Sequence, residues 1–193
     1  MGISYSTSEF RKGLKVLIDG EPYLMVESEF MKPGKGSAVY RTKLKHLLRG
    51  NVLDRTYRSG DRIEGADVAE SKLQYLYNDS KQWHFMDEES YEQYAINKEQ
   101  LGDAYKYLKE NERVDVVFWN GQPISVSPPN HVELQITYCE PGAKGNTATN
   151  VQKSATVETG AEISVPIFVN IGDVVKIDTR TGEYIGRVST GGG

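Results

Sequence analysis

The chain has 193 residues, of which 38% are hydrophobic and 26% are charged. This is the composition of a globular protein; it excludes a wholly disordered chain, and no segment approaches the roughly 20 apolar residues of a membrane span. The N-terminal residues 1–13 contain no apolar run of signal-peptide length, and Cys139 has no second cysteine to pair with. The sequence therefore predicts a cytoplasmic protein without an internal disulfide.

The net charge of −4 is unevenly distributed along the chain. Residues 1–64 carry 12 Lys and Arg against 8 Asp and Glu, whereas residues 65–127 carry 6 against 12 and residues 128–193 carry 5 against 7. Within 32–62, nine basic residues stand against two acidic ones. This block is a candidate phosphate-binding surface, because neutralised phosphates release counterions. The alternative is a strand face that is merely solvated.

Period-2 alternation predicts strands through the first 64 residues. The strand at 37–45 places Arg41, Lys43 and Lys45 on one face and apolar or β-branched residues on the other. We expect a small barrel of about five strands. The other strand ranges expected here are 14–19, 23–27 and 52–58.

One turn in this unit displays a single lysine. Lys32 and Pro33 are followed by Gly34, Lys35 and Gly36, with strand-like sequence on both sides. Proline fixes φ in a turn, and glycine allows unusual backbone conformations or close approach to a partner. The pattern predicts a hairpin tip that exposes the Lys35 ammonium group.

The sequence of the second unit, residues 65–127, also predicts strands. Asn120-Gly121 is a strong hairpin signal between two of them. We expect short helical pieces at 89–96 and 103–109, with the tyrosines of this unit serving mainly in packing. The expected strands are 72–77, 82–86, 113–119 and 122–126.

The third unit, residues 128–193, begins within a stiff linker that is expected at Ser127-Pro128-Pro129-Asn130. Residues 140–156 are rich in Gly, Thr, Asn and Pro and are expected to form a long loop. The second and third units fit small Greek-key barrels of the oligonucleotide/oligosaccharide-binding (OB) type. The expected strands are 131–139, 163–169, 174–177 and 184–188.

Few residues could carry enzymatic chemistry. The three histidines fall one in each unit, and the sequence contains no zinc-protease, paired-cysteine or serine-hydrolase motif. Gly34-Lys35-Gly36-Ser37 lacks the spacing of a phosphate-binding loop. The sequence thus calls for no catalytic residue, metal or other cofactor, and predicts a non-enzyme.

Four motifs in order carry a family resemblance: residues 32–38 (KPGKGSA), 75–79 (YLYND), 119–126 (WNGQPISV) and 175–184 (VKIDTRTGEY). The chain resembles the bacterial translation elongation factor P family as far as Val188. The resemblance implies an all-β fold of three consecutive small barrels, one KOW/SH3-like (1–64) and two OB-folds (65–127 and 128–193). It also implies an L shape that resembles tRNA.

The resemblance implies a function and partners as well. Members bind the 70S ribosome, both rRNA and ribosomal proteins, between the P and E sites. They stimulate peptide-bond formation and relieve stalling at consecutive prolines by positioning P-site peptidyl-tRNA. Lys35 matches the tip lysine that a modifying enzyme extends in many bacteria. A cytoplasmic monomer with no membrane partner is expected.

The resemblance and strand parity together assign a set of tRNA- or ribosome-binding residues. Tyr184 and Arg187 match a C-terminal motif that faces the small subunit, and for Tyr184 hairpin packing is an equal alternative. Residues 145–147 match a loop near the E-site codon, although Asn146 replaces a common aspartate and Ser37 a common amide residue. The assigned residues are Lys32, Pro33, Gly34, Lys35, Gly36, Arg41, Lys43, Lys45, Asn146, Thr147, Tyr184 and Arg187.

Three rival readings stay open. A general single-strand RNA binder would need exposed aromatics and a basic groove on the OB units, which are acidic. A paralogous factor would lack the tip lysine. An enzyme that uses Lys35 as a Schiff-base nucleophile would need a hydrophobic pocket, which a glycine-flanked tip does not provide.

Overall fold

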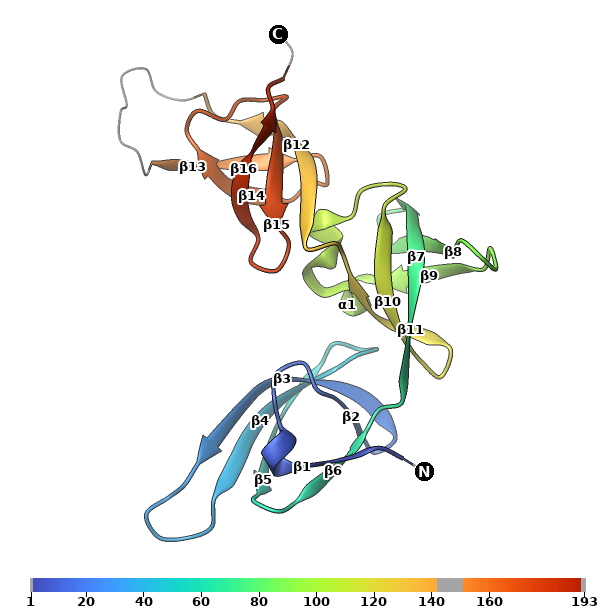
Figure 1. Ribbon diagram of the computed structural model, residues 1–193, viewed down its shortest axis with the longest axis vertical. Coiled ribbons are helices and arrows are strands. Elements are labelled where there is room, and N and C mark those ends of the chain that lie inside the picture. Colours follow the sequence, from blue (N-terminus) through green and yellow to red (C-terminus); the bar gives the residue numbers. More distant parts are fainter. Residues whose placement is uncertain (1, 142–150, 192–193) are drawn as a thin grey trace.

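The computed structural model describes residues 2–141 and 151–191. It is an all-β chain with three sheets in sequence order and one short α-helix within this range. Figure 1 shows the three sheets following one another along the longest axis, with a bend at the middle unit and the two chain ends far apart.

The first sheet has six strands in the order β1-β6-β2-β3-β4-β5, where about five were expected. Four of them lie at the predicted strand ranges, and the other two are the short β1 and β6, which pair with each other through Tyr5 and Ile63. The sheet coils around a core that includes Val16, Met25 and Leu44. The strands are β1 (Ser4–Ser6), β2 (Lys15–Ile18), β3 (Glu21–Met31), β4 (Val39–His46), β5 (Val52–Arg58) and β6 (Arg62–Gly65), with a 3-10 turn at Thr7–Glu9.

The second sheet has five strands in the order β11-β10-β7-β8-β9. The predicted Asn120-Gly121 hairpin is confirmed: both residues have positive φ, 49° and 75°, and they join β10 to β11. The strands are β7 (Val68–Asn78), β8 (Gln82–Asp87), β9 (Gln93–Asn97), β10 (Arg113–Trp119) and β11 (Gln122–Ser127).

The prediction of a helical piece at 89–96 is wrong. Asp87 Oδ1 accepts hydrogen bonds from the backbone N–H groups of Glu89 and Ser90, which makes a turn, and the chain then returns as β9 beside β8. Pairing with β8 decides the structure, and it overrides the local sequence. Helical structure lies further on, as α1 (Lys98–Leu101) and a 3-10 segment (Gly102–Tyr107).

The third sheet repeats the topology of the second. Its order is β14-β13-β12-β15-β16, so in both sheets the first strand is central, with strands two and three on one side and four and five on the other. The five-stranded Greek-key barrel of the OB type has this strand number. The strands are β12 (His131–Cys139), β13 (Gln152–Val157), β14 (Glu162–Pro166), β15 (Val174–Asp178) and β16 (Glu183–Ser189).

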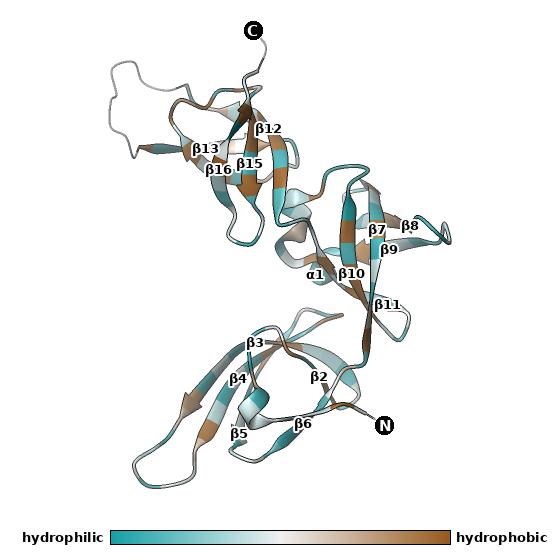
Figure 2. Cartoon of the chain, viewed as in Figure 1, coloured by the Kyte–Doolittle hydropathy of each residue, from teal (hydrophilic) through white to brown (hydrophobic). Residues whose placement is uncertain are grey.

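The prediction of a long loop over 140–156 is wrong at its C-terminal end, because Gln152–Val157 is strand β13. Ala155 and Val157 of this strand are buried in the core, while Gln152 and Ser154 are exposed. Figure 2 shows the same alternation of hydrophobic and hydrophilic residues along β12 and β15. Period-2 burial thus positions β12, β13, β14 and β15 against one core.

Apolar contacts join the units to one another. Leu47, from the turn after β4, is buried against Val117 and Ile124 of the second unit, with Leu48 and Trp119 at the margin. Between the second and third units, Tyr107 belongs to the core of the third sheet, and Thr159 Oγ1 donates a 2.6 Å hydrogen bond to the Lys106 carbonyl. The middle unit is therefore packed on both of its neighbours.

Candidate functional site

The turn at 32–36 joins β3 to β4. The two strands stay paired up to Met31 and Val39, and Lys32 to Ser37 are all exposed. In Figure 1 this turn lies at the end of the molecule opposite the C-terminus. Lys35 is therefore presented to solvent at one extreme of the chain.

Aromatic rings brace the base of this turn. The ring centroids of Phe30 and Tyr40 lie 5.0 Å apart in an edge-to-face arrangement, and Phe10 packs on Tyr40 at 5.8 Å. Such pairs contribute about 0.5–1.5 kcal/mol beyond the area they bury. They fix the direction in which the two strands leave the barrel.

The two glycines of the turn differ. Gly36 has φ +129°, a conformation that L side chains rarely adopt, whereas Gly34 has an ordinary φ and open space where a Cβ would lie. The sequence alone does not distinguish the two glycines. The structure shows that only Gly36 has a backbone conformation that favours glycine.

The predicted parity of β4 is confirmed. Arg41 and Lys43 are exposed and Lys45 is half-buried, while Thr42, Leu44 and His46 are buried. However, acidic residues on the neighbouring strands lie opposite the cations: Glu29 opposite Arg41, and Glu27 and Asp54 opposite Lys43. Lys43 Nζ lies 3.9 Å from Glu27 Oε2. The face of β4 is thus mixed in charge, and it is less basic than its own sequence indicates.

This face forms a shallow groove of about 640 Å³ across β3, β4 and β5. The groove adds Lys12 and Arg55 to the residues assigned from sequence. Arg58 lies directly opposite Val39, at the base of the turn that carries Lys35. Parity within one strand could not find these cations, although the charge block at 32–62 contains two of them.

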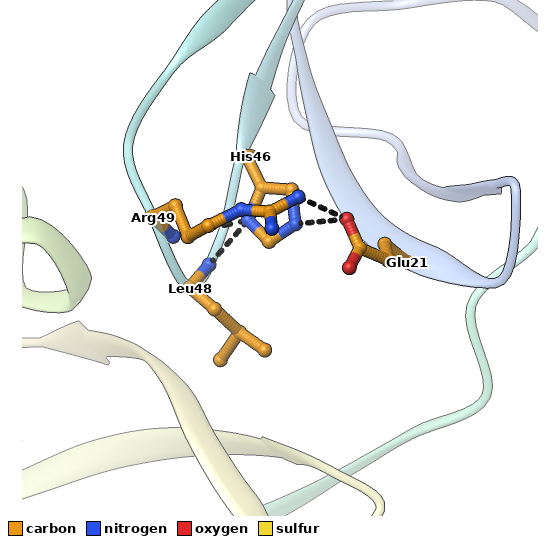
Figure 3. Close-up of polar contacts among 4 residues, drawn as sticks. All are labelled: Glu21, His46, Leu48 and Arg49. Atoms are coloured by element: carbon orange, nitrogen blue, oxygen red, sulfur yellow. Dashed lines mark hydrogen bonds and ion pairs between the residues drawn. The ribbon is translucent and has the colours of Figure 1, made fainter.

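A buried histidine holds the turn that follows β4 (Figure 3). His46 Nδ1 accepts hydrogen bonds from the backbone N–H groups of Leu48 and Arg49, at 3.1 and 3.0 Å. Nδ1 is therefore unprotonated, so Nε2 carries the proton and donates to Glu21 Oε2 at 2.8 Å. Arg49 binds the same carboxylate oxygen. The cluster fixes the turn that packs on the second unit.

At the other end of the molecule, Arg187 is engaged within its own unit. Its Nη1 lies 3.5 Å from Asp173 Oδ2, and its guanidinium carbon lies 5.0 Å from the Phe168 ring centroid. Burial opposes ionisation of Asp173, but hydrogen bonds from the Asn170 and Gly191 N–H groups and the Arg187 charge lower its pKa overall.

Tyr184 is half-buried and packs against the core of the third sheet. Burial raises the pKa of its hydroxyl. The packing alternative for this residue is therefore supported. Asn146 and Thr147 lie outside the described residues.

Three family models match the chain in consecutive segments. The elongation factor P KOW-like domain matches residues 6–63, the elongation factor P OB domain matches 68–126, and the elongation factor P C-terminal domain matches 132–187. The chain belongs to the elongation factor P family. It is a translation elongation factor by this membership, which implies interaction with the ribosome.

Solved structures give a second comparison. The chain is similar to eukaryotic translation initiation factor 5A from Methanococcus jannaschii, with 20% identity, a TM-score of 0.52, and coverage of 65% of this chain and 92% of that one. It also matches a translation initiation factor eif-5a family protein from Naegleria fowleri at 14% identity and a TM-score of 0.43, covering 65% of this chain and 98% of that one. The first likeness shows a shared fold.

The described residues hold neither a membrane-spanning helix nor a cluster of metal-ligating side chains. None of the helices there is long and apolar enough to cross a membrane. Over the same ranges, no three His, Cys, Asp or Glu side chains come together in a way that could hold a metal ion.

Proposed function

We propose that this elongation factor binds between the P and E sites of the 70S ribosome and stimulates peptide-bond formation at consecutive prolines by positioning P-site peptidyl-tRNA. The single observation that carries the proposal is the exposed Lys32–Gly36 turn at one extreme of the molecule. Its position in the only unit with a net positive charge supports a nucleic-acid partner for it.

We assign one proposed role to each of the three matched segments. The unit of residues 1–64 contacts tRNA, and the OB-type units 65–127 and 128–193 form a body that reaches along the ribosome with the outline of a tRNA. The three separate cores support these boundaries.

Positioning is sufficient as a mechanism. The ribosome supplies the chemistry, and a lysine against the acceptor end of the tRNA restricts the positions that the tRNA samples. Orientation of reactants contributes up to roughly 7–11 kcal/mol to barrier lowering in favourable cases. No proton-transferring side chain is then needed, which agrees with a non-catalytic factor.

Lys35 is also the proposed site of modification. Its side chain is exposed, and Gly34 and Gly36 add no side chain beside it, so a lysine-modifying enzyme can reach the ammonium group. A lengthened side chain would reach further toward the reacting ester. The intact mass of the protein from its native host tests this point.

The role proposed for β4 is narrower than the sequence indicates. Lys32 is an exposed cation in the turn and is the strongest candidate for a phosphate contact, while Arg41 is exposed but lies opposite Glu29. Lys43 already faces Glu27 and Asp54, so its contact with phosphate competes with these carboxylates. Asn146 and Thr147 remain proposed contacts near the E-site codon, and Tyr184 and Arg187 remain proposed contacts with the small subunit.

A photo-crosslinking experiment tests the placement. A photoreactive amino acid at position 35 should crosslink to P-site tRNA on a ribosome stalled at consecutive prolines. The matched control carries the same group at Lys81, which is exposed in the turn between β7 and β8. Equal crosslinking of tRNA from both positions, or none from position 35, would contradict the proposal.

A further inference from the structure

A pocket of about 510 Å³ lies where the second unit meets the third. Its aromatic wall contains Tyr75, Trp83 and Tyr105, and its rim contains Glu110, Lys109 and Glu158. Glu158 comes from the turn after β13, and the others come from the second unit. Both units are therefore needed to complete this pocket.

The aromatic wall is partly accessible. The ring centroids of Trp83 and Tyr105 lie 6.1 Å apart at an interplanar angle of 54°, so the two faces diverge. Both side chains are only half-buried. Lys98 Nζ already lies 4.8 Å from the Tyr105 ring centroid, which shows that this cluster accommodates a cation over an aromatic face.

The rim carries more negative than positive charge. Lys109 Nζ pairs with Glu158 Oε1 at 3.6 Å, while Glu110 is exposed and makes no ion pair with any described residue. Near the rim, Glu112 Oε2 is buried without a hydrogen-bond partner in the described part of the chain. Burial raises the pKa of Glu112, and the neighbouring Glu158 raises it further, although Lys109 acts in the opposite direction.

We propose that this pocket binds an arginine side chain from a basic segment of a protein partner. A guanidinium group is planar, so it can stack on Trp83 while its N–H groups pair with the Glu110 carboxylate. A nucleic-acid segment is disfavoured here, because residues 65–127 carry twice as many acidic as basic residues and repel phosphates. The inference rests on this pocket alone and is independent of the role proposed for Lys35.

The test uses the full-length protein labelled with ¹⁵N and the probe N-acetyl-arginine N-methylamide. The chain has two tryptophans, and hence two indole N–H resonances. Trp119 packs between the first and second units and serves as the internal control. The Trp83 resonance should shift with a dissociation constant on the order of 1 mM, while that of Trp119 stays in place.

Two matched comparisons sharpen the test. The citrulline analogue has nearly the same shape without the charge and should bind at least severalfold more weakly. Glu110→Gln should raise the dissociation constant roughly two- to fivefold, whereas Glu70→Gln, the same change at an exposed position of β7 outside the pocket, should leave it unchanged.

Several outcomes would overturn the proposal. They are equal binding of citrulline and arginine probes, equal shifts of both indoles, and equal affinities of the Glu110→Gln and Glu70→Gln variants. Binding of the lysine analogue as tight as that of arginine would overturn the choice of arginine. A short oligouridylate that shifts Trp83 and binds more tightly than the arginine probe would replace the protein partner with RNA.

Discussion

The two ends of the molecule carry motif residues of different kinds. At the first end, Lys35 is exposed on a turn and forms no ion pair or hydrogen bond with any residue the structure describes. At the other end, Tyr184 packs on a core and Arg187 binds Asp173 and Phe168. A motif residue is thus free to meet a partner in one case and is occupied within the fold in the other.

This difference between the two ends indicates which motif residues should matter for function and which for the stability of the fold. Removal of the Lys35 side chain should affect translation without affecting folding, whereas substitutions at Asp173 should lower the stability of the fold first. Gly36 is the exception within the turn, because its backbone conformation should matter for both stability and translation.

The largest stability effect is expected for Asp173→Ala. Asp173 is 3% exposed and accepts hydrogen bonds from the N–H groups of Asn170 and Gly191, at 2.9 and 2.8 Å. Its removal leaves these donors and Arg187 without their acceptor, which should lower the free energy of unfolding by about 2–4 kcal/mol. Urea unfolding of the variant and the parent protein measures this difference in the free energy of unfolding. A loss below about 0.5 kcal/mol would show that the cluster is not structural.

Tyr184 offers a sharper contrast between two substitutions. Tyr184→Ala removes a half-buried ring from the core and should cost about 1.5–3 kcal/mol. Tyr184→Phe should cost less than about 0.5 kcal/mol, because the hydroxyl has no hydrogen-bond partner among the described residues. If Tyr184→Phe instead lowers ribosome affinity at unchanged stability, the hydroxyl serves a partner.

The acid side of the stability profile should depend on Asp173. A carboxyl whose folded-state pKa is lowered stabilises the fold above its unfolded pKa of about 3.9, and this stabilisation is lost as pH falls through the folded value. Asp173→Asn should therefore flatten the loss of stability below about pH 4. Thermal unfolding across pH measures it, and an unchanged slope would assign the effect to other carboxyls.

The glycines of the turn should affect stability less than Asp173→Ala or Tyr184→Ala does, and they test whether the backbone shape of the turn matters. Gly36→Ala forces an L residue to φ +129° and should distort the turn at a cost of about 1 kcal/mol or more. Gly34→Ala has an ordinary φ and open space, so it should be neutral in stability. We expect Gly36→Ala to reduce polyproline synthesis and Gly34→Ala to leave it unchanged, because only the backbone of Gly36 is forced to change. Equal reductions by both variants would show instead that the turn must have no side chains beside Lys35.

Much of the fold follows from local pattern. The 131–139 strand and the Asn120-Gly121 hairpin were predictable, because alternation and turn chemistry agree with the sheet there. Strand β9 was not, since its pairing with β8 decides its structure. Strand β13 follows a Gly- and Thr-rich stretch, and its signal was lost in the composition of that stretch.

The candidate site was predictable in its exposed part and less so elsewhere. The exposed Lys35 turn follows from Pro and Gly chemistry within five residues. The carboxylates opposite Arg41 and Lys43 depend on the register of β3 and β5, and the Asp173–Arg187 pair joins residues from two strands. Such neighbours are set by tertiary pairing, which strand parity does not contain.

The most direct test of the central claim is the rate of synthesis of a polyproline reporter with purified ribosomes and the Lys35→Ala variant. Lys72→Ala, an exposed lysine on β7, is the matched control. We expect Lys35→Ala to lose the stimulation while its unfolding midpoint is unchanged, and Lys72→Ala to keep both the stimulation and the midpoint. Full stimulation by a folded Lys35→Ala protein would contradict the role proposed for Lys35.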